Sequence, residues 1–152
     1  MKDTQDGFAN LIGGEWVTTG ATRANINPSD TSDVIGHFAS AEQTAVDAAV
    51  AAARAALPAW AEASPQLRHD ILDAVGSELL ARKDEIGHLL AREEGKTLAE
   101  AIGETTRAGQ VFKFFAGEAL RVAGDLQPSV RPGIDVAVTR EPVGIVGLGR
   151  IG

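Results

Sequence analysis

The stretch Glu93-Glu94-Gly95-Lys96-Thr97-Leu98-Ala99-Glu100 decides the local architecture of the chain, because one helix ends in it and another begins. Gly95 follows a segment with apolar residues at helical spacing, and glycine readily takes the left-handed conformation that closes a helix. Two residues later, Thr97 and Glu100 have the spacing of a capping box. The sequence therefore predicts a helix that stops at Gly95 and a second helix that starts after Thr97.

Downstream of this junction, the second helix is expected to be long and to stop at Gly124. Its mainly apolar face has the spacing of an α-helix and comprises Ile102, Thr106, Val111, Phe112, Phe115, Ala119 and Val122. Aromatic residues make up only 5% of the chain. The loss of one should therefore matter for packing, and the phenylalanines at 112, 114 and 115 of this helix are expected in the core or in an interface rather than in a cofactor stack.

Two further long helices are expected upstream. The first has a capping-box pattern at Ser40 and Gln43, a face built largely of alanine, and a predicted end at Pro58, because proline disrupts a helix interior. The second begins at Ser64-Pro65, with serine as the N-cap and proline in the first helical position. The charged run 82–85 is expected to be a helix junction. The stripe that the second helix is expected to bury comprises Leu67, Ile71, Leu72, Val75, Leu79 and Leu80.

Residues 8–40 are expected to form short strands broken by turns. Leu11-Ile12 and Trp16-Val17 flank the pair Gly13-Gly14, which indicates a β-hairpin with a tight turn. Asn27-Pro28-Ser29-Asp30 predicts another turn, because proline presets φ while asparagine and aspartate bond the local backbone. The β-branched run at 34–38 predicts a further strand.

Residues 125–146 predict a return to extended structure. The alternation of apolar and polar residues over 134–140 is typical of a strand with one buried face. Val143-Gly144-Ile145-Val146 is uniformly apolar and suits a strand buried on both faces, as in a parallel sheet. The expected fold class is therefore α/β and incomplete: a helix-rich chain with short strands at both ends and the first strand of a Rossmann-like sheet.

The composition, with 44% hydrophobic and 23% charged residues, is that of an ordinary globular domain. The net charge of −7 argues against nonspecific binding to nucleic acid or to an anionic membrane, since both need a basic surface. No apolar run approaches the roughly 18–20 residues of a membrane span, and residues 1–7 are polar, with no signal-peptide core behind them. A cytoplasmic protein is expected.

The chain contains no cysteine, and this absence restricts the chemistry most. Disulfides, thiolate metal ligands and cysteine nucleophiles are all removed by it. The chain also has no tyrosine, so the candidate nucleophiles are Ser, Thr, Lys and carboxylates. His37, His69 and His88 lack partners at metal-ligand spacing. Each is expected to face solvent or to be satisfied in the core.

Taken in order, these elements and their local sequences resemble the N-terminal region of the NAD(P)-dependent aldehyde dehydrogenase superfamily. Each string is short, but their order and separations over residues 10–148 make the resemblance specific. The matching strings are 10–17, 26–28, 34–36, 48–54 with Trp60, 93–101, 114–117 and 140–147. Residues 117–121 and 128–133 further resemble the semialdehyde-oxidising branch, particularly α-ketoglutaric semialdehyde dehydrogenases.

The resemblance implies a domain organisation. Residues 1–124 would be the N-terminal strands and helices of the coenzyme-binding domain, 125–141 an oligomerisation-hairpin segment, and 142–152 the truncated start of the coenzyme-binding sheet. A homo-oligomer or association with a full-length subunit is implied, with no nucleic-acid or membrane partner. Family segments missing from this chain would bury much of the helices' apolar surface. The isolated chain is therefore expected to be poorly folded, to aggregate or to need a partner.

The resemblance also implies a reaction, the oxidation of an aldehyde to a carboxylic acid with NAD or NADP as the coenzyme of the full-length enzyme. In the family, a cysteine thiolate attacks the carbonyl, hydride passes to the nicotinamide, and a glutamate-activated water hydrolyses the thioester. An asparagine side chain and a backbone N–H stabilise the oxyanion. These groups lie further along the family's chain. The 152 residues, which lack the catalytic Cys and Glu, are expected to be inactive alone and to bind neither aldehyde nor coenzyme well, and no catalytic, coenzyme-binding or metal-binding residue is assigned in them.

The tail departs from the family pattern. After Gly147-Leu148 the family would continue with a Thr-Pro-Trp-Asn-type segment, whereas this sequence reads Gly149-Arg150-Ile151-Gly152. The spacing of Gly147, Gly149 and Gly152 resembles a dinucleotide fingerprint, but that motif needs a following helix and an acidic residue about 20 residues on. Neither is present. A weak dinucleotide-binding fragment, a truncated or altered gene product and a non-catalytic helical interaction module therefore stay open.

Two charged patterns have both a structural and a binding interpretation. Lys96 could mark an anion site, but a helix C-terminus favours a basic residue in any case. The acids at 93, 94, 100 and 104 could ligate a cation. Some members of the resembled family hold a monovalent cation with a backbone carbonyl, here near Ile26, and an acid, here Glu104. Exposed helical charge is the simpler interpretation.

Overall fold

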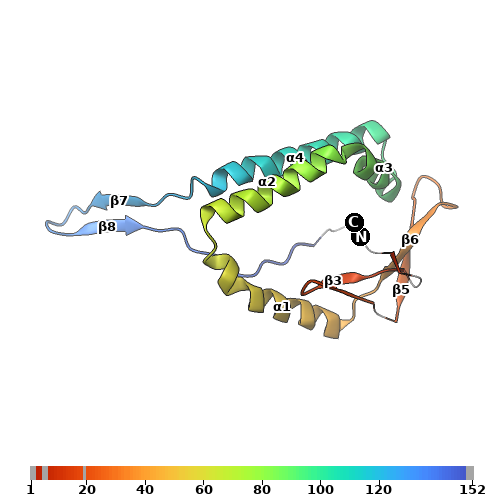
Figure 1. Ribbon diagram of the computed structural model, residues 1–152, viewed down its shortest axis with the longest axis horizontal. Coiled ribbons are helices and arrows are strands. Elements are labelled where there is room, and N and C mark those ends of the chain that lie inside the picture. The colour runs from red at the N-terminus through yellow and green to blue at the C-terminus, as the bar shows by residue number, and fades with distance from the viewer. Residues whose placement is uncertain (1–2, 5–6, 19, 150–152) are drawn as a thin grey trace.

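The computed structural model describes residues 3–4, 7–18 and 20–149, which form an α/β structure (Figure 1). Short strands lie at the N-terminal end, helices follow, and a second hairpin projects away from the helices. The helices are α1 (Gln43–Ala61), α2 (Pro65–Ala81), α3 (Lys83–Glu94) and α4 (Leu98–Ala119). The strands are β1 (Asp3–Thr4), β2 (Gly7–Phe8), β3 (Asn10–Ile12), β4 (Glu15–Val17), β5 (Thr22–Ile26), β6 (Val34–Ala39), β7 (Asp125–Pro128) and β8 (Asp135–Val138).

The junctions between the helices form as the sequence predicts. Ser64 caps α2, because its Oγ accepts a hydrogen bond from the Leu67 N–H at 3.1 Å. Helix α3 ends at Gly95, whose φ of 69° is left-handed. The Thr97 Oγ1 accepts from the Glu100 N–H, and the Glu100 carboxylate accepts from the Thr97 N–H. The predicted capping box is confirmed, and it fixes where α4 begins.

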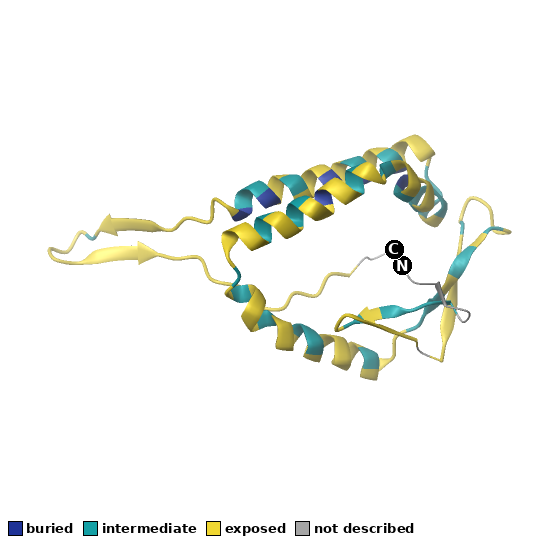
Figure 2. Cartoon of the chain, in the orientation of Figure 1, coloured by how far each residue is buried: buried dark blue, intermediate teal, exposed yellow. Residues whose placement is uncertain are grey.

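The core is the packing of α2 and α3 against α4, and it is built from small residues. Within the described part of the chain, Figure 2 shows buried residues on these helices alone: Gly76, Gly87, Ala101, Thr105, Gly109, Ala116 and Ala119. Where α2 crosses α4, a Cβ added to Gly76 would lie 2.9 Å from the Gly109 carbonyl oxygen. A Cβ added to Gly87 would lie 2.7 Å from Cγ1 of Ile102. Glycine therefore permits the close approach of these helices.

The N-terminal sheet has the strand order β1-β2-β6-β5. Strand β2 runs parallel to β6 through the pair Phe8 and Phe38, and β5 runs antiparallel to β6. The two phenylalanine rings stack with centroids 4.8 Å apart. Gly36 lies beneath the Phe8 ring, where any side chain would collide with it.

The predicted turns of the N-terminal region are confirmed. Strands β3 and β4 pair antiparallel across Gly13 and Gly14, whose φ angles of 61° and 87° suit a two-residue hairpin turn. In the turn between β5 and β6, the Ser29 N–H donates to Oδ1 of Asn27 at 2.9 Å. The Asp30 N–H donates to the Asn27 carbonyl at 3.2 Å. Local side-chain chemistry thus specifies both turns.

The predicted boundaries of α1 are wrong at both ends. Ser40 does not cap the helix, because its N–H donates to the Ala21 carbonyl at 2.9 Å and extends the pairing of β5 with β6. The helix begins three residues later, at Gln43, without a side-chain cap. Pro58 lies inside α1, because its carbonyl still accepts from the Glu62 N–H at 3.1 Å and one more turn forms.

The predicted end of α4 at Gly124 is also wrong. The helix ends at Ala119, and the N–H groups of residues 120 and 121 bond carbonyls only three residues back, which tightens the chain into a turn. Gly124 instead lies against the Val138 carbonyl, at the base of the β7–β8 hairpin, where a side chain would not fit.

The predicted burial of the large apolar side chains is wrong at most positions. On α2, Leu67, Ile71 and Val75 are 50%, 42% and 39% exposed, because the helix contacts α4 through the side that carries Gly76. Leu72, Leu79 and Leu80 are half-buried. The phenylalanines at 112, 114 and 115 of α4 are exposed, which rules out the core of this chain and leaves the predicted alternative of an interface. No element among the described residues covers these side chains.

The predictions for the C-terminal strands are correct in part. A strand forms within 134–140, but both faces of β8 are exposed, and residues 143–146 form no strand. Both differences have one cause: within the described ranges, no third strand pairs with the β7–β8 hairpin and none pairs with residues 143–146. Val143, Val146 and Leu148 consequently remain 96%, 74% and 100% exposed.

Candidate functional site

A groove of about 560 Å³ lies between the β3–β4 hairpin, α1 and residues 145–148. We call it the strand groove. The alanine-rich face of α1 forms one side of it, so small side chains leave the space open. Apart from the amide of Asn10, its lining is apolar: Leu11, Ile12, Ala41, Ala45, Val46, Ala49, Val50, Ala53, Ile145, Val146, Gly147 and Leu148. The groove suits apolar groups and offers no charged side chain to a ligand.

The glycine-rich tail does not form a phosphate cradle over its described residues. No atom lies within 4 Å of a Cβ added to Gly147 or Gly149, and no helix follows up to residue 149. Arg150, Ile151 and Gly152, which complete the fingerprint, lie outside the described residues. The adjacent strand groove has no basic side chain, whereas a phosphate needs helix-terminal N–H groups or cations. Over residues 147–149 the tail therefore does not have the phosphate-binding geometry of the fingerprint.

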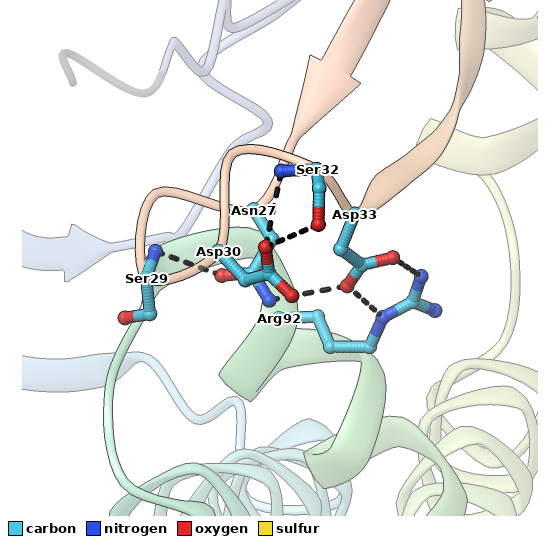
Figure 3. A network of polar contacts seen from close by, with 6 residues as sticks. All are labelled: Asn27, Ser29, Asp30, Ser32, Asp33 and Arg92. Carbon is cyan, nitrogen blue, oxygen red and sulfur yellow. Dashed lines mark hydrogen bonds and ion pairs between the residues drawn. The ribbon is translucent and has the colours of Figure 1, made fainter.

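A second candidate is a group of polar residues that we call the polar clamp: Asn27, Ser29, Asp30, Ser32, Asp33 and Arg92 (Figure 3). Arg92 on α3 donates from Nε and Nη2 to the two carboxylate oxygens of Asp33, at 2.9 and 2.6 Å. Asn27 donates from Nδ2 to the same carboxylate at 3.1 Å. The hydrogen bond from Arg92, followed by that from Asn27, lowers the pKa of Asp33 to about 2.

The clamp joins the N-terminal sheet to the end of α3. Ser29 donates from Oγ to the Gly95 carbonyl at 2.9 Å, and nearby Asn25 donates from Nδ2 to Glu93 at 2.8 Å. Asp30 accepts from the N–H and the Oγ of Ser32, which orders the turn itself. Because its charged and hydrogen-bonding groups are directed at one another, the clamp is a structural joint rather than a catalytic cluster.

Lys96 is held by two carboxylates. Its Nζ lies 2.7 Å from Glu104 and also contacts Glu94. These hydrogen bonds, that of Glu104 first, raise the pKa of Lys96. Because Lys96 is already paired with two carboxylates, the contacts argue against an anion site at this lysine. Glu104, the acid that the cation hypothesis needs, is occupied by the same ion pair. Within the described ranges, no group of three or more His, Cys, Asp or Glu residues could hold a metal ion.

Two contacts between α2 and α4 were not predicted from the sequence. His69 places Nδ1 2.9 Å from the Ala116 carbonyl, so it is satisfied between the helices. Lys113 donates to Asp73 at 2.8 Å and to Ser77 at 2.6 Å. The signal for the second contact is weak, since Asp73 and Ser77 share one helical face but Lys113 lies 36 residues beyond Ser77. His37 and His88 are exposed, in agreement with the prediction.

Residues 16–148 match the aldehyde dehydrogenase family. The chain belongs to the aldehyde dehydrogenase family. It is 36% identical over 146 residues, 95% of its length, to the α-ketoglutaric semialdehyde dehydrogenase of Bacillus subtilis (strain 168). The match to the family ends at residue 148. The departure of the tail from the family pattern begins at the next residue, Gly149. The predicted resemblance, including its semialdehyde branch, is confirmed.

Solved structures of the family share this fold. Succinate-semialdehyde dehydrogenase from Burkholderia pseudomallei superposes with a TM-score of 0.82 at 31% identity, over 93% of this chain and 29% of that enzyme. A double mutant of betaine aldehyde dehydrogenase from Staphylococcus aureus, in complex with NAD+, superposes with a TM-score of 0.81 at 27% identity, over 92% of this chain and 28% of that one. The predicted α/β class and its incompleteness are confirmed.

The aldehyde dehydrogenase chain described here spans about 30% of the length of the curated relatives that it matches and corresponds to their N-terminal portion. These relatives favour a portion of a dehydrogenase over a helical interaction module or a dinucleotide-binding fragment. Within the described residues, no helix combines the length and the apolar character needed to cross a bilayer.

Proposed function

We propose that these residues serve an NAD- or NADP-dependent enzyme that oxidises a semialdehyde to the corresponding carboxylate in the cytoplasm. The observation that carries the proposal is the 36% identity to α-ketoglutaric semialdehyde dehydrogenase over 95% of the chain. The similarity to succinate-semialdehyde dehydrogenase supports the same substrate class. The NAD+ bound to the betaine aldehyde dehydrogenase relative supports the coenzyme class.

In this proposal the chain supplies scaffold rather than reacting groups. Residues 1–124 form the N-terminal strands and helices of the coenzyme-binding domain, and 142–152 begin its sheet. Residues 125–141 supply a hairpin for oligomerisation, and the exposure of every residue of β7 and β8 supports that role. The 152 residues include no cysteine, so a thiolate nucleophile has to come from outside them.

A chimera tests the proposal. Residues 16–148 would replace the matched region of the Bacillus subtilis enzyme, and oxidation of α-ketoglutaric semialdehyde would be followed through the absorbance of NADH or NADPH. The chimera is expected to be active. A control chimera with Gly76→Val is expected to lose activity, because the added side chain separates α2 from α4. A chimera with native-like circular dichroism and size but no activity would contradict the proposal.

A further inference from the structure

A cavity of about 300 Å³ lies where the end of α1, the first turn of α2 and the chain leaving the β7–β8 hairpin meet (Figure 1). We call it the arginine pocket. Unlike the strand groove, it is lined by charged as well as apolar side chains, which include Trp60, Arg68, Val122, Arg140, Glu141 and Pro142. Apolar walls with a few polar groups that orient the ligand are typical of small-molecule sites, whose volumes begin at about 300 Å³.

Arg68 is fixed by the backbone but keeps part of its guanidinium group for a ligand. Its Nη2 donates to the carbonyls of Trp60 and Ala61, at 3.3 and 2.7 Å, and so secures the C-terminal end of α1. Its Nε and Nη1 donate to no group among the described residues, within which Arg68 also forms no ion pair. The residue is half-buried, so its guanidinium group is only partly hydrated.

Arg140 is anchored in the same way, from a different segment. Its Nε donates to the Ala123 carbonyl at 3.2 Å, which leaves Nη1 and Nη2 without an acceptor in the described part of the chain. Glu141 also lines the pocket, but it lies beyond ion-pair distance of both guanidinium groups. The pocket therefore presents two guanidinium groups that no carboxylate of the described residues neutralises.

This combination of side chains suits carboxylates joined by a short carbon chain. The parallel N–H donors of a guanidinium group match the two oxygens of a carboxylate. Trp60, which is 45% exposed, Val122 and Pro142 supply apolar walls for the carbon chain. Inorganic phosphate has no apolar part to contact these walls, and its compact charge cannot be divided between two separate arginines.

We propose that the arginine pocket binds a small dicarboxylate, with one carboxylate on Arg68, the other on Arg140 and the carbon chain against Trp60. The activity proposed above produces such a molecule, because oxidation of the aldehyde group of a semialdehyde yields a dicarboxylate. The choice of ligand therefore rests on the proposed function, whereas the pocket and its arginines are properties of this chain.

The fluorescence of Trp60 tests the proposal. The 152-residue chain has two tryptophans, so Trp16→Phe in the full chain leaves Trp60 as the single emitter. The probe is α-ketoglutarate, the dicarboxylate that corresponds to the semialdehyde named for the Bacillus subtilis relative. A saturable change in emission is expected, with half-saturation below about 1 mM. Absence of a saturable change would overturn the inference, as would equal binding of the uncharged dimethyl ester.

Two further ligands separate a dicarboxylate site from a general anion site. Acetate, which engages one arginine, is expected to bind at least about ten-fold more weakly than α-ketoglutarate. Inorganic phosphate is expected to be similarly weak, and phosphate binding as tight as that of α-ketoglutarate would overturn the inference. An emission change that follows the concentration of the chain, and that α-ketoglutarate does not affect, would instead indicate an acidic side chain of a second copy and would also overturn it.

Variants at adjacent residues are expected to act in opposite directions. Arg140→Gln should weaken binding of α-ketoglutarate by about ten-fold or more, whereas Glu141→Gln should tighten it about two- to five-fold by removing a like charge. The control is Arg131→Gln, at an exposed arginine of the β7–β8 hairpin outside the pocket, and it should bind as the parent does. Arg68 is left unchanged because it also secures α1. Equal binding by the two arginine variants would overturn the inference, as would weaker binding by Glu141→Gln.

The titration contains neither aldehyde nor coenzyme, so its outcome is separate from that of the chimera. An active chimera together with a chain that does not bind α-ketoglutarate would overturn the inference and leave the proposed function standing. Binding of α-ketoglutarate together with an inactive chimera would overturn the proposed function and support the arginine pocket.

Discussion

At the scale of single residues, the Asp33–Arg92 pair predicts how the joint between sheet and helices responds to acid. The folded-state pKa of Asp33 is lowered from 3.8 to about 2, so the unfolded state binds its proton first as pH falls. The stability contributed by the pair is therefore complete above pH 3.8 and is lost between 3.8 and about 2.

The expected result is a difference between the native chain and Asp33→Asn that shrinks through this acid range. Amide exchange in the β5–β6 turn, measured against pH, would report it. Asp135→Asn is the control, since Asp135 forms no ion pair among the described residues. An exchange difference for Asp33→Asn that persists unchanged at pH 2 would contradict the assignment.

A second prediction concerns Thr97, whose hydroxyl oxygen accepts a hydrogen bond from the Glu100 N–H in the capping box of α4. Thr97→Ala should destabilise the first turn of the helix by about 1 kcal/mol and speed its amide exchange about five-fold. Thr97→Ser keeps the oxygen and should restore most of the protection. If serine and alanine behaved alike, the hydroxyl would not be the stabilising group.

The junction residues Gly95 and Thr97, whose partners are close in sequence, were predicted correctly, whereas the contact between Asp33 and Arg92 was not. Gly95 and Thr97 follow from rules that span one helical turn. The Asp33–Arg92 pair joins residues 59 positions apart, and no local pattern distinguishes this aspartate from the other acids of the chain. The sequence therefore predicted the turn of the polar clamp but not the Asp33–Arg92 pair that joins this turn to α3.

At the scale of elements, the crossing of α2 and α4 depends on Gly76. A Cβ at this position would meet the Gly109 carbonyl oxygen at 2.9 Å and the Lys113 N at 3.2 Å, and backbone cannot move aside cheaply. Gly76→Ala should therefore destabilise the helices by about 1–3 kcal/mol, which would lower the midpoint of the circular dichroism melt.

Gly103 on α4 provides the matched control, because a Cβ there meets no atom within 4 Å. Gly103→Ala should stabilise the helix by roughly 0.5–1 kcal/mol, since alanine has less freedom to lose than glycine. The two identical substitutions are thus expected to have opposite signs. A rise in the midpoint for both would show that the crossing tolerates a methyl group.

The existence of the helices was predictable, while their ends and burial were less so. Apolar spacing is a property of the segment itself, but the pairing of Ser40 with Ala21 competes with the predicted cap from outside the helix. The stripe containing Leu67 and Ile71 was identified, yet its burial needs a neighbour that the described residues do not include. The same holds for the strand predicted at 143–146, because a strand is defined by its partner.

At the scale of the whole molecule, large apolar side chains remain exposed on every helix and on the C-terminal segment. Single exposed apolar residues are ordinary, but patches this extensive favour association. The isolated chain is expected to bind a hydrophobic dye, to self-associate increasingly with concentration and to melt over a broad range. A monomeric sample with one sharp transition, the same by circular dichroism and fluorescence, would contradict this prediction.

The polar clamp also has a consequence for the order of events during synthesis. The hydrogen bonds that join the clamp and the nearby Asn25 to α3 and Gly95 span 59, 66 and 68 residues, so none can form until residues 92–95 have left the ribosome. The N-terminal sheet is translated first, but its partners at the end of α3 are translated more than fifty residues later, after α1 and α2. Each helix, by contrast, can form its internal hydrogen bonds as it leaves the ribosome, because they join residues that are close in sequence. The earliest part of this chain to be made is therefore secured to α3 only after α1, α2 and α3 have all been translated.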